Sequence, residues 1–354
     1  MASHAFATQT GRLNKFAGEI IGHAIAQECI SRGGRQVRYD KNKSDTYVAR
    51  QWVPWNATAA SPNTFFGSTT LIDRGNAIVQ AHQTSEGITV TPDSMQARDV
   101  TVVMQQYSCL YGWTDKTANL YEDKIPEQAK IQSGERVTFV NEMICFSALK
   151  AATNVFFGGT GNSRATVNGA ISLPMLRRIS ASLMRNHGRP VNRMLSASGE
   201  YDTTAVPPGF TVYCSTDLES SIRDLPNFNP AEKYATGKPM ENEIGMCERF
   251  RFITSPEFVQ ILDGATAVTA ATFGLQTTGG TNPDVYQFIV TAADAWSQIA
   301  VRGLDAVQPA YLPAGVQSKS DPFGQRGYAG AMWWKAVMIE NNGWLAVGNV
   351  GIPA

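Results

Sequence analysis

The chain has 354 residues, more than one compact core usually holds, so we expect two lobes or one lobe with long extensions. Its 43% hydrophobic and 17% charged content is typical of a globular protein and not of a disordered one. The 30 basic and 30 acidic residues cancel, which argues against a dedicated nucleic-acid binder and leaves identical subunits without long-range repulsion.

An amphipathic helix is predicted near the N-terminus, ended by Gly33 and Gly34. Its apolar positions recur at helical spacing: Leu13, Phe16, Ala17, Ile20, Ile21, Ala24, Ile25 and Cys29. A stripe of this kind has to pack on something, and both its own domain and a neighbouring subunit remain open from the residues alone.

Residues 35–96 are polar and interrupted by Pro and Gly, with two strand-like pieces, Gln36–Tyr39 and Thr46–Ala49. Such a stretch buries too little apolar surface to build its own core, so we expect it to project outward. The charged segment Asp40–Asp45 is predicted to be its tip, with Trp52 and Trp55 behind, ordered by a partner. The alternative is a flexible insertion without a role.

A long strand and a long helix follow. Asp99–Thr114 is rich in β-branched and aromatic residues and is predicted to form one strand. Pro126–Phe157 is predicted to be a helix stopped by glycines, since Ala, Val and Ile recur every three or four residues. Gly134 costs about 1 kcal/mol in a helix relative to Ala, which allows the first turns to form a separate short helix.

The segment from residue 160 to 304 alternates predicted helices and strands. Ser215 to Asp217 offer an N-cap for the short helix Leu218–Leu225. In Glu243–Phe252, a strand with Phe250 and Phe252 on one face is expected. The other elements predicted here are a helix at Leu173–His187, strands at Phe210–Cys214 and Tyr286–Thr291, and a helix at Ala292–Val301.

The last fifth of the chain begins with the turn Asp321-Pro322 and several glycines. Ala331–Ile339 is predicted to be a strand, and Asn341-Asn342-Gly343 to be a tight turn into a second strand. This pattern predicts a C-terminal β-hairpin and contains nothing typical of reaction chemistry.

The C-terminal segment from Ser320 onward, the unit around Ser215–Leu225 and the turn Glu243-Ile244-Gly245 resemble tailed-phage major capsid proteins with the HK-97-type fold, specifically the podophage N-4-like group. Thr216 stands where that family has proline. The resemblance spans Ile125–Val350 at the level of motifs.

This resemblance implies an α+β fold with four parts. They are an N-terminal arm (1–35), an extended β-loop (36–98), a peripheral domain with a spine helix and a long sheet (99–159 and 305–354), and an axial domain (160–304).

The resemblance also implies a function. The chain would self-assemble as hexamers and pentamers into an icosahedral phage head that encloses double-stranded DNA, contacted non-specifically. Assembly would take place in the host bacterial cytoplasm, with possible scaffold, decoration or cement, and portal proteins and no membrane. We predict inter-subunit contacts at Phe16, Ile20 and Ile25 of the arm, and at Lys41, Lys43, Trp52 and Trp55 of the loop.

Catalytic and cofactor motifs are missing from the sequence. The five cysteines contain no CxxC pair, so we expect small buried thiols in a reducing compartment. The histidines, His4, His23, His82 and His187, lack metal-ligand spacing. Gly158–Ser163 lacks the lysine of a phosphate loop, and Ser196–Gly199 lacks the first glycine of a nucleophile elbow. We therefore predict no catalytic residue, cofactor or metal.

The sequence shows neither a signal peptide nor an apolar run of membrane-spanning length, so a soluble, non-secreted protein is expected. Two alternatives remain. The shell of a cellular nanocompartment would share the fold, and a carbohydrate-binding or hydrolytic β-rich protein would suit the seven tryptophans. The second alternative leaves the long helix unexplained.

Overall fold

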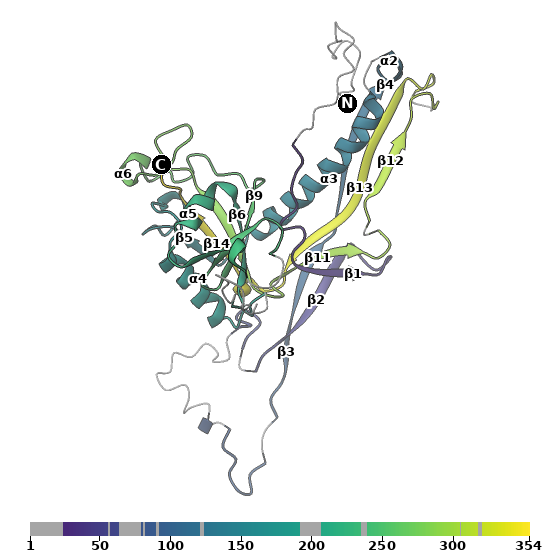
Figure 1. Ribbon diagram of the computed structural model, residues 1–354. Coiled ribbons are helices and arrows are strands. Elements are labelled where there is room, and N and C mark those ends of the chain that lie inside the picture. The colour runs from purple at the N-terminus through teal and green to yellow at the C-terminus, as the bar shows by residue number, and fades with distance from the viewer. Residues whose placement is uncertain are drawn as a thin grey trace.

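The computed structural model describes residues 24–55, 57–63, 79–80, 82–89, 92–120, 124–191, 207–234, 239–304, 306–317 and 321–354. Figure 1 shows an elongated lobe, in which helix α3 (Ile125–Leu149) lies along strand β13 (Arg326–Ile339). A second lobe holds α4 (Leu173–Arg185). A ribbon of β2 (Thr46–Val53) and β3 (Gln96–Val103) packs with one face on the elongated lobe and leads towards the bottom of the view.

The elongated lobe is built on a five-stranded sheet in the order β1-β11-β13-β12, with β4 also paired to β13. β13 pairs antiparallel with β4 from Arg326 opposite Thr114 to Lys335 opposite Gln105. Only the edge pair, β1 with β11, is parallel. The strands besides β13 are β1 (Arg35–Tyr39), β4 (Gln105–Thr114), β11 (Trp296–Val301) and β12 (Gln308–Leu312).

Helix α3 covers one face of this sheet. Pro126 stands in its first turn, where the backbone N–H groups have no acceptor within the helix, so the N–H that proline lacks is not needed. Ala129 packs with Trp113 and Ala329, and Val137 packs with Cys109 and Trp333, so the small and branched residues of the helix face the aromatic residues of β4 and β13. The short helix α2 (Asp115–Leu120) joins β4 to α3.

The second lobe is built on a seven-stranded sheet in the order β5-β14-β10-β6-β9-β8-β7. Its strands are β5 (Val155–Phe157), β6 (Phe210–Ser215), β7 (Phe228–Pro230), β8 (Glu243–Cys247), β9 (Phe250–Ser255), β10 (Tyr286–Thr291) and β14 (Leu345–Val350). The remaining short helices within the described residues are η2 (Arg164–Thr166), η3 (Thr216–Leu218), α5 (Glu219–Arg223), η4 (Ala231–Lys233), α6 (Ala270–Phe273) and η5 (Asn342–Trp344).

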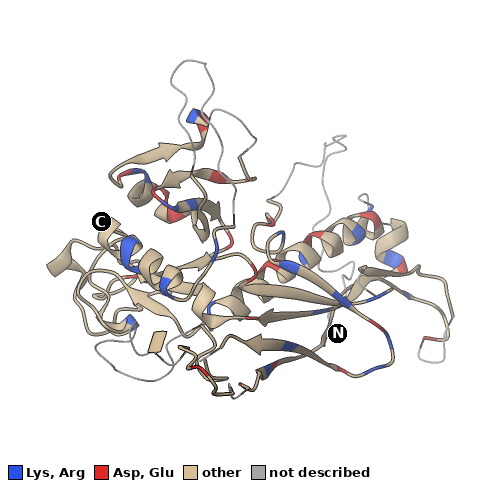
Figure 2. Ribbon diagram, turned by 90° about the horizontal axis from the view of Figure 1, so that it is seen from below, with Lys and Arg blue, Asp and Glu red and all other residues tan. Residues whose placement is uncertain are grey.

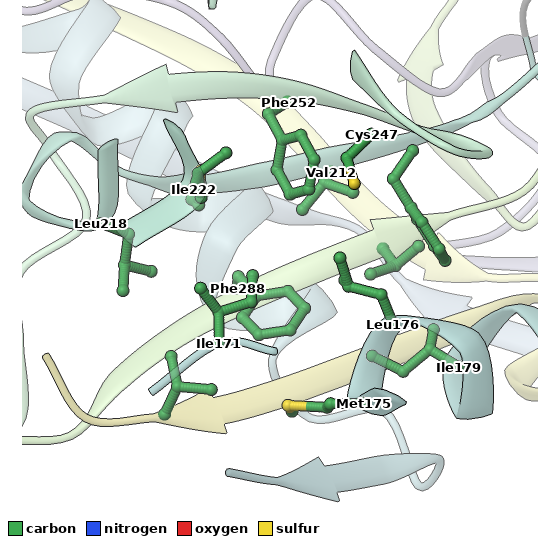
Figure 3. Close-up of a cluster of buried hydrophobic side chains, with 14 of the residues drawn as sticks. Ile171, Met175, Leu176, Ile179, Val212, Leu218, Ile222, Cys247, Phe252 and Phe288 are labelled. Carbon is green, nitrogen blue, oxygen red and sulfur yellow. The ribbon is translucent and has the colours of Figure 1, made fainter. Parts of the chain in front are cut away.

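α4 buries an apolar stripe against this sheet. Met175, Leu176, Ile179 and Leu183 are completely buried, and their spacing of three or four residues places them on one side of the helix. Figure 3 shows Met175, Leu176 and Ile179 in a cluster with Phe288 of β10. A second cluster, which includes Ile30, Phe146 and Trp296, joins the two lobes.

Several predicted elements are confirmed. β1 and β2 lie where the two strand-like pieces were expected, and β6, β10 and α4 match their predicted segments within two residues. Ser215 caps the following helical turn, since its side chain accepts the backbone N–H of Asp217.

The predicted C-terminal hairpin is wrong. β13 pairs with β4, β11 and β12, whereas β14 pairs with β10 and β5 in the other sheet. The turn between them is the 3-10 segment Asn342–Trp344, which carries the chain from one lobe to the other, and the side chain of Asn341 accepts the N–H of Gly343 at 3.0 Å. Each strand has a better partner far away in the sequence, which no local turn signal reveals.

The long helix ends earlier than predicted. α3 stops at Leu149, and Val155–Phe157 instead forms the parallel edge strand β5 beside β14. Ala151, Ala152 and Val155 continue the helical spacing beyond Leu149, and this spacing led to a predicted helix that is too long. Gly134 does not divide the helix, which is continuous from Ile125.

Two predicted strands also differ. The predicted single strand 99–114 is divided at Met104, whose N–H donates to Asp45 O at 2.8 Å, and its two parts join different sheets. Residues 243–252 form the hairpin β8–β9, turning at Glu248 with a φ of 50°. Phe250 and Phe252 are both buried as expected.

The predicted helix 292–301 is instead a turn followed by the strand β11 from Trp296, because pairing with β1 and β13 overrides its weak helical preference. The predicted N-terminal helix is absent from its described part, Ala24–Cys29, which is irregular; the residues before Ala24 lie outside the described part of the chain.

Candidate assembly surfaces

The root of the N-terminal segment is fixed to the spine helix by one carboxylate. Glu142 of α3 is fully buried, and its side chain accepts the backbone N–H groups of Cys29 at 3.1 Å, Ile30 at 2.8 Å and Ser31 at 3.0 Å. Gln298 of β11 adds hydrogen bonds from Nε2 to the carbonyls of Ser31 and Gly33. Residues 29–33 of the predicted arm are therefore tied to α3 and β11 by hydrogen bonds.

The chain becomes exposed immediately before this root. Ile25 has 62% of its surface exposed, which fits its predicted contact role but does not show the contact. Phe16 and Ile20 lie outside the described residues. An exposed isoleucine beside a firmly held root is suited to burial against another molecule.

The β2–β3 ribbon has two unlike faces. Tyr47, Ala49, Val100 and Val102 face inward and pack on the sheet of the elongated lobe. The outward face carries exposed apolar side chains, Trp52 at 63%, Val48 at 51% and Val103 at 46%. Tryptophan is among the side chains enriched at the centres of protein interfaces. The exposed Trp52 on this face is therefore suited to a contact with another molecule.

The predicted tip residues do not lie together. Lys41 and Lys43 occupy the turn between β1 and β2, where the Lys43 ammonium lies 3.3 Å from Asp40. Trp52 and Trp55 lie at the opposite end of β2, towards the part of the loop that projects. The charged segment is thus not the tip, because β1 belongs to the sheet of the body and not to the ribbon.

The loop beyond β2 is partly organised by its own side chains. Trp55 is 45% exposed, its Nε1–H donates to Asp93 at 3.1 Å, and its ring meets His82 edge-on at 4.7 Å. Met95, Ile88 and Val79 are exposed along the same loop, and sequence reasoning missed them. The sequence could have indicated them, because they are isolated apolar residues within a polar segment. Phe323, Val259 and Leu262, in loops of the two lobes, were missed in the same way.

Charges of both signs are interspersed over both lobes and along α3 (Figure 2). This distribution agrees with the formal net charge of zero. Long-range repulsion between identical copies is therefore weak.

Reactive chemistry has little support among the described residues. Within them, His, Cys, Asp and Glu form no group of three that could hold a metal ion. The five cysteines are free and buried. Burial raises the pKa of the Cys145 thiol to about 11, so it is protonated and unreactive at neutral pH. None of the described helices combines the length and apolar character needed to cross a bilayer.

The architecture matches solved phage capsids over the whole chain. The capsid of Ralstonia phage GP4 aligns with a TM-score of 0.61 at 9% identity, covering 100% of this chain and 99% of that one. The mature capsid of bacteriophage PhiM1 aligns with a TM-score of 0.57 at 10% identity, covering 96% and 92%. The capsid of cyanophage P-SCSP1u aligns at 0.54 and 10%. The fold is therefore the HK-97-type fold of phage capsid subunits, as predicted.

Sequence comparison points the same way. The chain is 21% identical over 220 residues to the major capsid protein of Pseudomonas phage KPP21, covering 58% of this chain. The match spans about half (55%) of that relative's length. No family profile matches the chain, and nothing in the comparisons supports the podophage N-4-like subgroup, which stays a prediction.

Proposed function

We propose that this chain is the major capsid subunit of a tailed phage and that it acts by self-assembly. One observation carries the proposal: the β2–β3 ribbon leaves Trp52 63% exposed on its outward face, in a fold shared from end to end with capsid subunits. A side chain so exposed on a monomer is stabilised when a neighbouring copy covers it.

The assembly we propose consists of hexamers and pentamers in an icosahedral head around double-stranded DNA. The lobe of α4 and β6 would form the axial domain near the five- and six-fold axes, and the lobe of α3 and β13 the peripheral domain. Many modest contacts, repeated by symmetry, make such a shell cooperative. DNA would be contacted weakly and without sequence preference, since a chain with no basic excess has little charge with which to hold the phosphates.

The same proposal assigns no enzymatic activity to the chain. Its remaining partners would be a scaffold, a decoration or cement protein, and a portal, as expected from the resemblance. The protein would be located in the virion after assembly in the host cytoplasm.

Electron microscopy of the purified chain tests the proposal, with closed icosahedral particles as the expected result. Trp52→Ser should reduce their yield while leaving the melting temperature of the subunit unchanged, because the side chain is exposed. Met184→Ser, which changes an exposed apolar residue of α4, should keep the yield and serves as the control. A chain that stays monomeric at high concentration, or equal losses in both variants, would contradict the proposal.

Deletion of residues 1–23 tests the arm separately. This cut preserves the three hydrogen bonds from Cys29, Ile30 and Ser31 to Glu142, so the subunit should stay folded. Particles that are normal after this deletion would remove the arm from the assembly mechanism.

A further inference from the structure

The two sides of the β2–β3 loop are held by consecutive residues of the connection between β13 and β14. On the outgoing side, Asn63 and Asn341 exchange a reciprocal pair of amide hydrogen bonds, at 2.8 Å and 2.6 Å. On the returning side, Arg98 of β3 donates from Nη2 to Glu340 O at 2.9 Å. Both pairs are far apart in sequence, so only the fold brings Asn63 to Asn341 and Arg98 to Glu340.

The atoms involved are partly or fully removed from water. Asn341 is 2% exposed, and Arg98 and Asn63 are half-buried. Burial lowers the pKa of the Arg98 guanidinium, which is held between Oε1 of Gln51 at 2.7 Å and the carbonyl of Glu340. Buried polar groups with defined partners fix one geometry, because any other arrangement leaves them unsatisfied.

The connection that receives these bonds is itself tied to β1 and to the second lobe. The carboxylate of Glu340 accepts two hydrogen bonds from Arg35 of β1. Trp344 donates from Nε1 to Asn186 O at 2.7 Å, at the end of α4. Residues 340–344 are thus linked to the loop, to β1 and to the α4 lobe.

The chain is also closely packed at this point. A Cβ added to Gly343 would lie 2.3 Å from Nδ2 of Asn63 and 2.9 Å from Cγ of Asn186. The loop side chain, the connection and the end of α4 therefore meet here, and a side chain at this position would displace the amide of Asn63 or Asn186.

We infer that Asn63 and Arg98, bound to Asn341 and Glu340, are positioning residues that fix the direction in which the β2–β3 loop leaves the body. We call these four residues the loop latch. The inference rests on the proposed function, since a fixed loop direction matters when the loop has to meet a neighbouring subunit. The latch lowers the conformational cost of that contact because it orders the loop before binding.

A distance measurement on the unassembled subunit tests the latch. Met95→Cys in the loop and Leu262→Cys on the second lobe are both exposed sites for spin labels, whereas the five native thiols are buried. We expect a narrow distance distribution by electron paramagnetic resonance. Asn63→Ala and Arg98→Ala should each broaden and shift it. Arg50→Ala, which removes an exposed guanidinium paired with Asp99 on the other face of the ribbon, should leave it unchanged.

The outcomes separate the latch from the proposed function. An unchanged distribution in both latch variants, or a broad one in the parent chain, overturns the latch whether or not the chain assembles. Failure of the parent chain to assemble overturns the proposed function and leaves the distances interpretable. If Arg98→Ala does not fold, Asn63→Ala decides the question alone. Loss of closed particles in Asn63→Ala without any change of distance would also overturn a positioning role.

Discussion

The carboxylate of Glu142 accepts the backbone N–H of Ile30 at 2.8 Å, across 112 residues of sequence, and both residues are fully buried. The same side chain accepts the neighbouring N–H groups of Cys29 and Ser31. A strand or helix would have satisfied these three donors through the backbone, but the segment is irregular here. One acid of the spine helix therefore decides where the N-terminal segment leaves the body.

Replacing this acid should destabilise the subunit. Glu142→Ala leaves three N–H groups without an acceptor and is expected to lower the free energy of unfolding by about 3 kcal/mol. Glu142→Gln keeps one acceptor oxygen and should cost less. Glu127→Gln, in the exposed first turn of the same helix, is the control and should change little. Urea unfolding measures all three, and equal effects of Glu142→Ala and the control would contradict the assignment.

The buried pair of Arg251 and Glu243 provides a second prediction. The guanidinium donates twice to the carboxylate, at 2.6 Å each, and the side chains are 6% and 0% exposed. Burial acts to lower the pKa of Arg251, but the hydrogen bonds and charge of Glu243 outweigh it and raise that pKa. Glu243→Ala leaves a buried cation unpaired and should cost about 3 to 5 kcal/mol.

The exposed pair Arg177 and Glu248 is the matched control for this ion pair. Glu248→Ala should cost at most about 1 kcal/mol, because water screens and replaces that interaction. Thermal unfolding of the two variants compares them directly. The prediction fails if the exposed pair proves as important as the buried one.

Stability should fall at alkaline pH because of buried thiols. The pKa of Cys145 is raised from 9.0 to about 11 by burial, so the folded state keeps a proton that the unfolded state releases above pH 9. The corresponding stability is fully present below pH 9 and is lost as the pH rises to about 11. The loss from this thiol is on the order of 1 to 3 kcal/mol. Cys145→Ala should reduce the slope of unfolding free energy against pH in this window, and an unchanged slope would exclude the thiol.

Two glycines should respond to alanine in opposite directions. A Cβ at Gly348 would lie 2.1 Å from Phe288, a completely buried ring, so Gly348→Ala should destabilise by about 1 to 3 kcal/mol. Gly134 lies in the exposed middle of α3 with open space around its Cα, so Gly134→Ala should stabilise by about 0.5 to 1 kcal/mol. Calorimetry on both variants checks the signs, and a shift in the same direction would contradict the packing described.

Sequence patterns were sufficient where the deciding interactions are local or apolar. The stripe of Leu176, Ile179 and Leu183 predicted α4, and the N-cap at Ser215 was readable from three adjacent residues. The patterns failed where the partner is distant. Asn341 to Gly343 looked like a hairpin turn, yet the two strands join different sheets. Trp52 is exposed, as its place in a polar segment indicated. Lys41 was placed with it at the loop tip, but the turn that holds Lys41 follows β1, which is a strand of the body sheet.

By itself the sequence determined several local elements, the absence of catalytic motifs and the core-poor character of residues 35–96, whereas the class of fold was implied by the resemblance of its motifs to a known family. Periodicity, capping and composition act over a few residues, so they are readable without coordinates. Only the tertiary structure decided which strands pair, where α3 ends, and that Glu142 and Asn341 hold segments more than a hundred residues away. These choices depend on which distant backbone groups find a partner once water is excluded, and no local pattern encodes that.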